Sequence, residues 1–384
     1  MHLGILTGGG DVPGLNSAIK AVVNEAHHNG WTVTGFRRGW AGPVMTDPHN
    51  LEATADHHFP LTPQFVRSIN RTGGTILHSS RTRPSRMKAA DVPGHVTRKV
   101  PHADEGYLDV TGHVLSVIEA LEIDVLIAIG GDDTLSYAAE LHEAGAPTMC
   151  IPKTMDNDVF GTDYCIGFST CVTRSVEMIN RLRTAAGSHE RFLIVEMFGR
   201  NCGMTALAAG YLADADRTLI AEVPFDLGRL AELMTADRAA NPSNYAVCVV
   251  SEGAMVSGEH IIEKGEADAY GHRKLGGIGE RIGVGLKELT GTNMMIQNLG
   301  YLLRSGPPDA VDLIVAKNFG TQVVQLIAEG RTGLMVSITD GHYTVRPADI
   351  STRGVHRVDV EGMYDAAGYR PKISRVEGTT MYLR

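Results

Sequence analysis

The chain has 384 residues, of which 43% are hydrophobic and 21% charged, and its formal net charge is −9 at pH 7. This length exceeds the roughly 250 residues at which single hydrophobic cores stop growing, so we expect two domains with a cleft between them. The acidic balance gives no general reason to expect nucleic-acid binding, and no apolar run reaches the ~18 residues that a membrane span needs.

The first residues lead straight into a core-like strand, 2-HLGILTG-8, without a basic segment or a cleavage site. This start predicts a protein that is not exported. The five cysteines are odd in number and scattered, without the spacing typical of a zinc site or a disulfide framework. We therefore expect a cytoplasmic protein.

Strand-like and helix-like segments alternate along the chain, which is typical of parallel β/α sheets. Two helices, at 15–30 and 169–187, show apolar residues at three- and four-residue spacing and end near glycine. The strand-like segments are apolar runs at 2–8, 31–37, 123–130, 191–197, 216–223 and 245–253. The predicted fold class is α/β, with two Rossmann-like three-layer domains, parallel-sheet cores and an inter-domain active-site cleft.

Glycines follow the first strand in 7-TGGGDVPGLN-16, just before the first predicted helix. The amides at a helix N-terminus favour anions, so this loop suits a phosphate group. The loop matches neither GxGxxG nor GxxxxGK(S/T), and a plain tight turn is the alternative interpretation.

Residues 67–99 are rich in arginine and lysine, with Asp91 the single acid among them. A solvated loop would explain this charge as well as a binding surface would. Within the segment, 73-GGTILHSSR-81 combines a glycine turn with Arg81, a pairing suited to an anionic oxygen.

A second glycine-rich strand end is 123-IDVLIAIGGDDTLS-136, where a buried strand leads into two glycines and two aspartates. Ligands of open α/β sheets bind at such C-terminal strand ends. If the ligand is a phosphate, Asp132 and Asp133 require a cation beside it, and a hard divalent ion such as Mg²⁺ prefers oxygen ligands. The simpler alternative is a turn in which an aspartate caps the helix 134–145.

The segment 152-PKTMDND-158 places Thr154, Asp156 and Asp158 at alternating positions, which face one way if the chain is extended. One carboxylate could then accept a proton from a substrate hydroxyl while its neighbour helps to hold a metal. Lys153 adds a positive charge for a phosphate. An aspartate-rich turn is the alternative interpretation.

Charged residues also stand at the ends of later predicted elements. Arg191 and Arg200 lie at opposite ends of one strand, and Glu252 ends the next long strand. Tyr301 and Arg304 are three residues apart and share a face if their segment is helical. Each of these has a simple alternative as a surface or core-edge residue.

Taken in this order, the motifs GGDD, PKTMDND and VEMFGR resemble those of the 6-phosphofructokinase family, in particular its pyrophosphate-dependent type. The resemblance covers roughly residues 1–350. NAD kinases share the GGD turn but lack the later TxDND and GR motifs, which separates the two groups. The resemblance implies a reversible glycolytic enzyme that phosphorylates the C1 hydroxyl of fructose 6-phosphate and gives fructose 1,6-bisphosphate.

The resemblance implies roles on the donor side of the cleft. Gly9 and its neighbouring amides would hold the transferred phosphoryl group, Arg81 would bridge donor and acceptor phosphates, and Asp132 would bind Mg²⁺. Asp156 would be the general base, with Thr154 and Asp158 beside it. Arg200 would stabilise the charge that develops during transfer.

On the acceptor side, the resemblance implies contacts to the sugar and to its phosphate. Arg304 and Arg191 would hold the 6-phosphate, with Arg191 reaching in from a neighbouring subunit. Glu252 would bind the sugar. The remaining substrate contacts implied are Phe198, Gly199 and Tyr301, besides Thr154, Asp156 and Arg200 from the catalytic set.

Asp133 and Lys153 indicate the donor. Family members that use ATP carry glycine where this chain has Asp133, whereas members that use inorganic pyrophosphate carry the aspartate and the lysine. A carboxylate there would repel the α-phosphate of a nucleotide, and Lys153 can neutralise a donor that stops at two phosphates. This predicts pyrophosphate as the donor. The alternative is an ATP-dependent 6-phosphofructokinase that tolerates Asp133 by shifting the loop that carries it.

The chain departs from the family pattern near Met295, where a second phosphate-binding arginine is expected. Loss of such a contact costs about 1.5–3 kcal/mol unless Arg83, Lys287 or Lys317 replaces it. A related acceptor such as sedoheptulose 7-phosphate is therefore an alternative. A noncatalytic sensor on the same scaffold would lack the base or the metal carboxylate, and this chain has both.

The family pattern implies that the chain is divided into two domains and a C-terminal tail. Residues 1–165 plus about 303–350 would form the donor domain, and 166–302 the sugar-phosphate domain. Residues 351–384 would be a tail that closes against one domain or both. The protein would act on pyrophosphate and a sugar phosphate as a homodimer or homotetramer, without nucleic acid or membrane.

Overall fold

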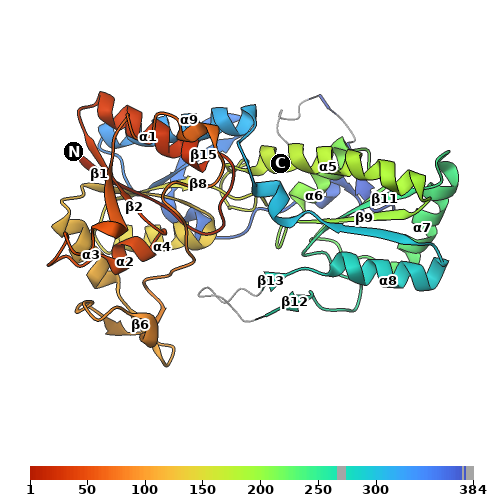
Figure 1. Cartoon of the computed structure of the whole chain (residues 1–384), viewed down its shortest axis with the longest axis horizontal. Helices are drawn as coiled ribbons and strands as arrows, with labels where there is room; N and C mark the ends of the chain where they lie inside the picture. The colour runs from red at the N-terminus through yellow and green to blue at the C-terminus, as the bar shows by residue number, and fades with distance from the viewer. Residues whose placement is uncertain (266–273, 374–375, 378–384) are drawn as a thin grey trace.

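The computed structural model describes residues 1–265, 274–373 and 376–377. Two sheets form the cores of two lobes that lie side by side in Figure 1. The larger sheet consists of β1 (His2–Thr7), β2 (Thr32–Phe36), β3 (His58–Leu61), β7 (Val125–Gly130), β8 (Thr148–Pro152), β15 (Leu334–Thr339) and β16 (His342–Pro347). The smaller sheet consists of β9 (Phe192–Met197), β10 (Arg217–Leu219), β11 (Ala246–Ser251) and β14 (Met294–Asn298).

The larger sheet has the order β16-β15-β8-β7-β1-β2-β3, and its five central strands are parallel. Only the edge strands β3 and β16 are antiparallel, and β16 forms a hairpin with β15. The six residues of β7, VLIAIG, are all buried, as expected for a central strand covered on both faces. The smaller sheet, β10-β11-β9-β14, is parallel throughout.

Helices cover both sheets in three-layer arrangements (Figure 1). The larger sheet is covered by α1 (Leu15–His28) and α9 (Ala310–Ala328), and on its other face by α2 (Ala41–Met45), α3 (Thr111–Ala120) and α4 (Asp132–Glu143). The smaller sheet is covered by α5 (Phe168–Ser188) and α6 (Met204–Leu212), and on its other face by α7 (Leu227–Ala240) and α8 (Ile278–Thr290).

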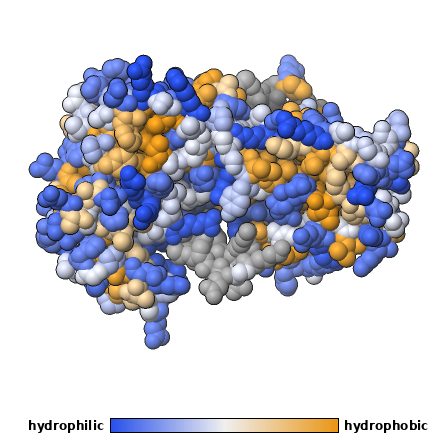
Figure 2. Space-filling model, viewed as in Figure 1, coloured by the Kyte–Doolittle hydropathy of each residue, from blue (hydrophilic) through white to orange (hydrophobic). Residues whose placement is uncertain are grey.

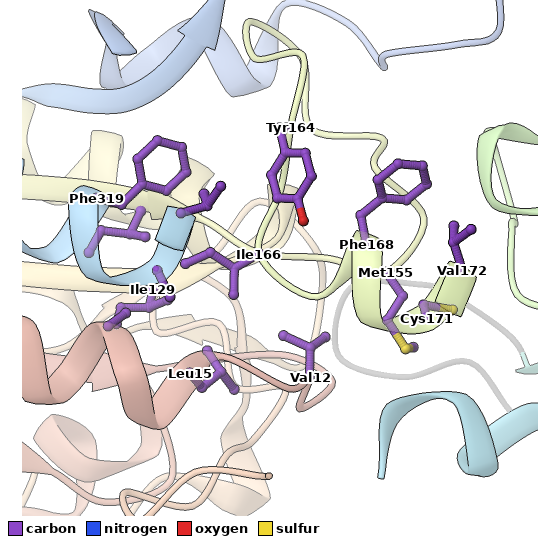
Figure 3. Packing of buried hydrophobic residues seen from close by; sticks show 14 of the residues in the cluster. Val12, Leu15, Ile129, Met155, Tyr164, Ile166, Phe168, Cys171, Val172 and Phe319 are labelled. Atoms are coloured by element: carbon purple, nitrogen blue, oxygen red, sulfur yellow. The ribbon is translucent and has the colours of Figure 1, made fainter. Parts of the chain in front are cut away.

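One hydrophobic cluster continues from the larger lobe into the smaller one (Figure 3). Leu15 of α1 and Phe319 of α9 belong to it, as do Phe168 and Cys171 at the start of α5. Tyr164, on the loop between the sheets, packs edge-on against Phe168 with ring centroids 6.0 Å apart. The loop between the lobes is therefore fixed by buried packing.

Smaller elements extend from this framework. Residues 87–109 form a projecting three-stranded arm, and the chain after β16 crosses to the smaller lobe (Figure 1). The short strands are β4 (Met87–Lys88), β5 (Val100–Pro101), β6 (Tyr107–Asp109), β12 (Glu263–Lys264), β13 (Lys274–Leu275), β17 (Tyr364–Asp365) and β18 (Arg370–Pro371). The short helices are η1 (Ala55–His57), η2 (Ile69–Arg71), η3 (Ala89–Asp91), η4 (Gly300–Arg304), η5 (Ala348–Thr352) and α10 (Val360–Met363).

The predicted α/β fold is confirmed, and each predicted strand and helix is present with shifts of a few residues. The largest shift is in β10, which covers three residues of the predicted 216–223. The aspartate cap proposed for the helix from 134 is wrong, because α4 already begins at Asp132 and Gly131 occupies the cap position.

The surface mixes hydrophilic and hydrophobic residues over both lobes on the face shown in Figure 2. Among the described residues, no helix combines the length and the hydropathy needed to cross a membrane. All five cysteines are buried, and none is paired in a disulfide in the structure.

Candidate active site

A cleft of about 1390 Å³ lies between the lobes, at the carboxyl ends of strands from both sheets. Seven residues predicted for the site line it, and they come from segments far apart in the sequence: Gly9, Arg81, Phe198, Arg200, Glu252, Tyr301 and Arg304. Ligands of open α/β sheets bind at this position, because the loops that follow parallel strands gather there.

The first glycine loop approaches the buried lysine of another loop. Gly9 has φ of 76°, and a Cβ added there would lie 3.2 Å from Lys153 Nζ. The Gly9 amide donates to the Ser80 carbonyl oxygen over 3.0 Å, and Ser79 Oγ donates back to the Gly9 carbonyl oxygen. These bonds tie the loop to the segment that carries Arg81, so the two predicted phosphate contacts lie on one wall.

Asp132, at the first position of α4, is arranged as a metal ligand would be. Its Oδ1 is buried and has no hydrogen-bond partner within the described part of the chain. Burial, followed by the charges of the nearby Asp158 and Asp133 carboxylates, raises the pKa of Asp132 to about 8, although Lys153 opposes this shift. A divalent cation would supply the missing partner and the missing positive charge, so the residue fits Mg²⁺.

The described residues contain no group of three or more histidine, cysteine or acidic side chains that could enclose a metal alone. Mg²⁺ commonly binds one or two carboxylates together with substrate phosphates and water, and Asp132 would supply one such carboxylate. Asp133 follows Asp132 in the first turn of α4, beside the same strand end.

Residues 153–158 form a bent loop after β8. The extended arrangement proposed for 152–158 is wrong, because Asn157 adopts a left-handed conformation with φ of 55°. The Asp156 amide donates to Thr154 Oγ1 over 3.2 Å, which closes a small turn. Lys153 is only 4% exposed, and burial, followed by the charge of Arg81, lowers its pKa to about 8.

Asp156 lies where the two sheets meet. Its Oδ2 accepts a hydrogen bond from the Arg200 backbone amide over 3.3 Å. Burial raises its pKa well above the usual range, and the carboxylates of Asp158 and Glu252 add to the rise. A buried carboxyl group with a raised pKa suits general-base work on a hydroxyl group.

The turn after β9 requires glycine. Gly199 has φ of 133°, and a Cβ there would lie 2.4 Å from Ser251 Oγ. The Gly199 carbonyl accepts hydrogen bonds from Ser251 Oγ over 2.5 Å and from the Gly253 amide over 3.1 Å. This close packing places Arg200 and Glu252, which follow the neighbouring parallel strands β9 and β11, on the same wall of the cleft.

Tyr301 and Arg304 share one side of η4, as predicted. The Arg304 guanidinium carbon lies 4.2 Å from the centre of the Tyr301 ring, a cation–π contact. Arg304 Nε also lies 3.4 Å from Asp11 Oδ1 on the first glycine loop. The tyrosine is 65% exposed, so the pair stands at the mouth of the cleft.

Other predicted residues lie outside this cleft. Arg191 stands before β9, at the opposite end of the strand from Arg200. Met295 lies on β14 and packs against the hydrophobic core. Neither of these residues lines the cleft, nor does any of the three proposed replacements for the missing arginine: Arg83, which pairs with Glu140 at 2.7 Å, Lys287 and Lys317.

Sequence analysis missed several residues of the cleft. Glu196 of β9 lines it and is 2% exposed, and its carboxylate accepts from the Gly279 amide and from Asn298 Nδ2, each over 2.8 Å. His78, within the predicted 73–81 turn, also lines the cleft and has φ of 58°. The motif VEMFGR contains Glu196, so the sequence could have indicated this residue. The partners of its carboxylate lie 80 or more positions away, and no local pattern indicates them.

Glycine loops, buried carboxylates and arginines at the meeting of two parallel sheets define a phosphoryl-transfer enzyme. The Phosphofructokinase family model matches residues 2–327, and the chain belongs to the phosphofructokinase family.

Named relatives differ in their donors. The chain is 39% identical over 342 residues to a pyrophosphate–fructose 6-phosphate 1-phosphotransferase of Amycolatopsis methanolica, covering 88% of this chain and 90% of the relative. It is 37% identical over 340 residues to ATP-dependent 6-phosphofructokinase 3 of Streptomyces coelicolor, covering 88% and 91%. The fold is similar to that of a pyrophosphate-dependent phosphofructokinase from Marinobacter aquaeolei, with a TM-score of 0.73, 17% identity, and coverage of 100% and 98%.

Proposed function

We propose that the protein transfers a phosphoryl group from inorganic pyrophosphate to the C1 hydroxyl of fructose 6-phosphate, reversibly, giving fructose 1,6-bisphosphate in the cytoplasm. The observation that carries the donor assignment is Asp133, which follows Asp132 directly in the first turn of α4. A second carboxylate there disfavours the additional phosphate of a nucleotide. The relatives' names support phosphoryl transfer to fructose 6-phosphate, whereas their donors include both pyrophosphate and ATP.

The donor would lie against the first glycine loop. Asp132 would hold Mg²⁺, which when bound neutralises the charge of the phosphate oxygens. Lys153 and Arg81 would contact the donor through their positive charges. Lys153 stands beside Gly9, and Arg81 follows Ser80, whose carbonyl oxygen accepts from the Gly9 amide. These groups orient the terminal phosphoryl group toward Asp156.

Asp156 would accept the proton of the C1 hydroxyl as its oxygen attacks the terminal phosphorus. The bond between that phosphorus and the bridging oxygen then breaks, and inorganic phosphate leaves. Arg200 lies beside the base and would stabilise the charge on the transferred group. Thr154, bonded to the Asp156 amide, would keep the loop in place.

The acceptor would occupy the side of the cleft formed by Glu252, Tyr301 and Arg304, which Phe198 also lines. Gly199 lies in the turn behind these residues, bonded to Ser251. Arg191 lies outside this chain's cleft, so its predicted contact requires a neighbouring subunit in a homodimer or homotetramer. The donor domain would comprise residues 1–165 and about 303–350. Residues 166–302 would supply the acceptor domain.

Initial rates with purified protein, Mg²⁺ and fructose 6-phosphate test this function, with pyrophosphate and ATP compared at matched concentrations. We expect turnover with pyrophosphate and at least about 10²-fold less with ATP. Turnover with ATP alone would overturn the donor assignment. Turnover with sedoheptulose 7-phosphate but not with fructose 6-phosphate would overturn the acceptor assignment.

A further inference from the structure

A segment near the C-terminus links the catalytic loop to the smaller lobe. We name residues 355–371 the strap. Before it, η5 packs against α4 in the larger lobe. The strap then passes the loop after β8 and ends beside β10 of the smaller sheet, through its short strands β17 and β18. The family model ends at residue 327, so the strap lies outside the matched segment.

The strap contacts the catalytic loop through one histidine and its neighbour. Val355 forms an isolated antiparallel bridge with Val159. The His356 amide donates to the Asp158 carbonyl oxygen over 2.9 Å, and the His356 ring Nδ1 donates to the Asn157 carbonyl oxygen over 2.7 Å. The strap thus satisfies two successive carbonyl groups that directly follow Asp156.

Those two carbonyls belong to a turn that needs support. Asn157 is fully buried in a left-handed conformation, which is costly for most residues and tolerated by asparagine. Its side chain donates to the Asp163 carbonyl oxygen over 2.9 Å and accepts from the Cys165 amide over 2.8 Å. The His356 bond therefore completes the set of contacts that fixes the direction in which Asp156 points.

Two residues further on, the strap contacts the other half of the catalytic centre. The Val358 amide donates to Glu222 Oε1 over 2.9 Å, and the same carboxylate accepts from the Gly203 amide over 3.0 Å. Gly203 caps α6 and follows Arg200 by three residues. Residues 356–358 thus connect the loop of Asp156 to the loop of Arg200.

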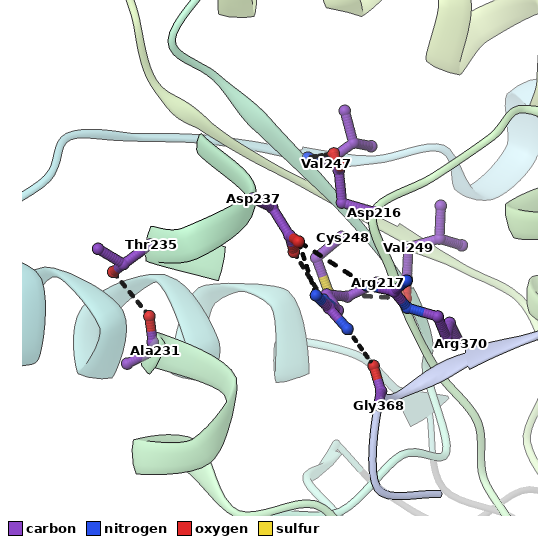
Figure 4. Close-up of polar contacts among 10 residues, drawn as sticks. All are labelled: Asp216, Arg217, Ala231, Thr235, Asp237, Val247, Cys248, Val249, Gly368 and Arg370. Carbon is purple, nitrogen blue, oxygen red and sulfur yellow. Dashed lines mark hydrogen bonds and ion pairs between the residues drawn. The ribbon is translucent and has the colours of Figure 1, made fainter. Parts of the chain in front are cut away.

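The far end of the strap is anchored in the smaller lobe. Arg217 forms a bidentate ion pair with Asp237, with both distances 2.6 Å, and donates to the Gly368 carbonyl oxygen over 2.5 Å (Figure 4). The buried Tyr364 hydroxyl donates to the Thr218 carbonyl oxygen over 2.7 Å. These contacts fix the strap, so the position of His356 is determined by both lobes.

We infer that the strap sets the geometry of the catalytic centre and that His356 is a positioning residue for the general base Asp156. The inference rests on the proposed function, because it assumes that Asp156 receives the acceptor's proton. A displacement of about 1 Å at a reacting group can lower turnover about 10²-fold, so loss of one bond in this turn should slow chemistry.

The test compares three variants with the wild type. His356→Ala removes the ring donor and should lower kcat about tenfold or more, with both KM values within about twofold of wild type. His356→Asn keeps a donor near the position of Nδ1 and should restore most of kcat. His342→Ala is the matched control, because His342 Nδ1 makes the same kind of bond, to the Asp340 carbonyl oxygen at the exposed β15–β16 hairpin. It should keep wild-type kinetics.

A measurement without substrate separates this inference from the proposed function. Hydrogen–deuterium exchange should be faster in peptides covering 154–166 in His356→Ala, where the Cys165 amide is otherwise bonded, and unchanged in His342→Ala. This result would stand even if the donor or acceptor were assigned wrongly. The inference is overturned if exchange in that segment is unchanged, or if kcat per folded molecule of His356→Ala equals that of wild type.

Discussion

The backbone amide of Arg200 donates to the carboxylate of Asp156 over 3.3 Å, and this bond joins the turn after β9 to the loop after β8. Arg200 follows a strand of the smaller sheet, and Asp156 follows a strand of the larger sheet. Any change in the angle between the lobes therefore alters the distance between the proposed base and the arginine. Thr205 Oγ1 reinforces the contact by donating to the Met155 carbonyl oxygen over 2.7 Å.

Removal of the proposed base should abolish most turnover without unfolding the protein. Asp156→Asn keeps an acceptor for the Arg200 amide but cannot take the hydroxyl proton at neutral pH. We expect kcat to fall at least about 10²-fold, with substrate binding largely retained. Steady-state kinetics and calorimetric binding measure the two effects. Asp349→Asn, which removes an exposed ion pair with Arg353, is the control and should stay within about twofold of wild type.

The donor preference should depend on Asp133. Asp133→Gly removes the second carboxylate from the start of α4 and should make ATP turnover appear or rise. The ratio of kcat/KM for pyrophosphate to that for ATP should fall at least about tenfold. An unchanged ratio would show that this carboxylate does not select the donor.

The metal site can be tested through stability as well as rate. Because burial raises the pKa of Asp132 to about 8, its contribution to stability is present below about pH 4 and is lost as the pH rises through about 8. At pH 8.5 and without metal, Asp132→Asn should therefore have a Tm equal to or above that of wild type. Mg²⁺ with pyrophosphate should raise the Tm of wild type more than that of the variant. Equal rises, measured by scanning calorimetry, would exclude Asp132 as the ligand.

Affinity for pyrophosphate should depend on pH through Lys153. The pKa of this lysine is lowered to about 8, so its ammonium group is charged below that value and becomes neutral above it. The KM for pyrophosphate should therefore rise between pH 7 and pH 9. In Lys153→Met the KM should be higher throughout, without the rise across this range. A rise of the same size in both would assign the dependence to another group.

The strands and the glycine loops could be predicted from sequence because their signals are local. A strand covered on both faces, such as β7, is a continuous apolar run, and the glycines at its end mark the turn. The order of these motifs also indicated the family. The contacts between Tyr301 and Arg304 followed from their three-residue spacing.

Other parts of the site depend on residues that are distant in sequence. The bend at Asn157 requires bonds from Asp163, Cys165 and His356, and no local pattern indicates them. The course of the strap follows from buried contacts such as that of Tyr364 with Thr218. Arg83 also has a long-range partner that no local pattern indicates, Glu140 on α4, besides its bond to Ser85 in its own segment.

The ion pair between Arg304 and Asp11 means that the acceptor arginine already has a counter-charge before a substrate arrives. A sugar phosphate bound to Arg304, as proposed, would compete with this carboxylate, which lies on the first glycine loop. The exchange makes weak, singly charged anions poor competitors, because they gain little over the carboxylate they replace. It would also couple the two proposed substrates: an acceptor that releases Asp11 would change the charge facing the donor loop, so we expect the affinity for one substrate to depend on the presence of the other.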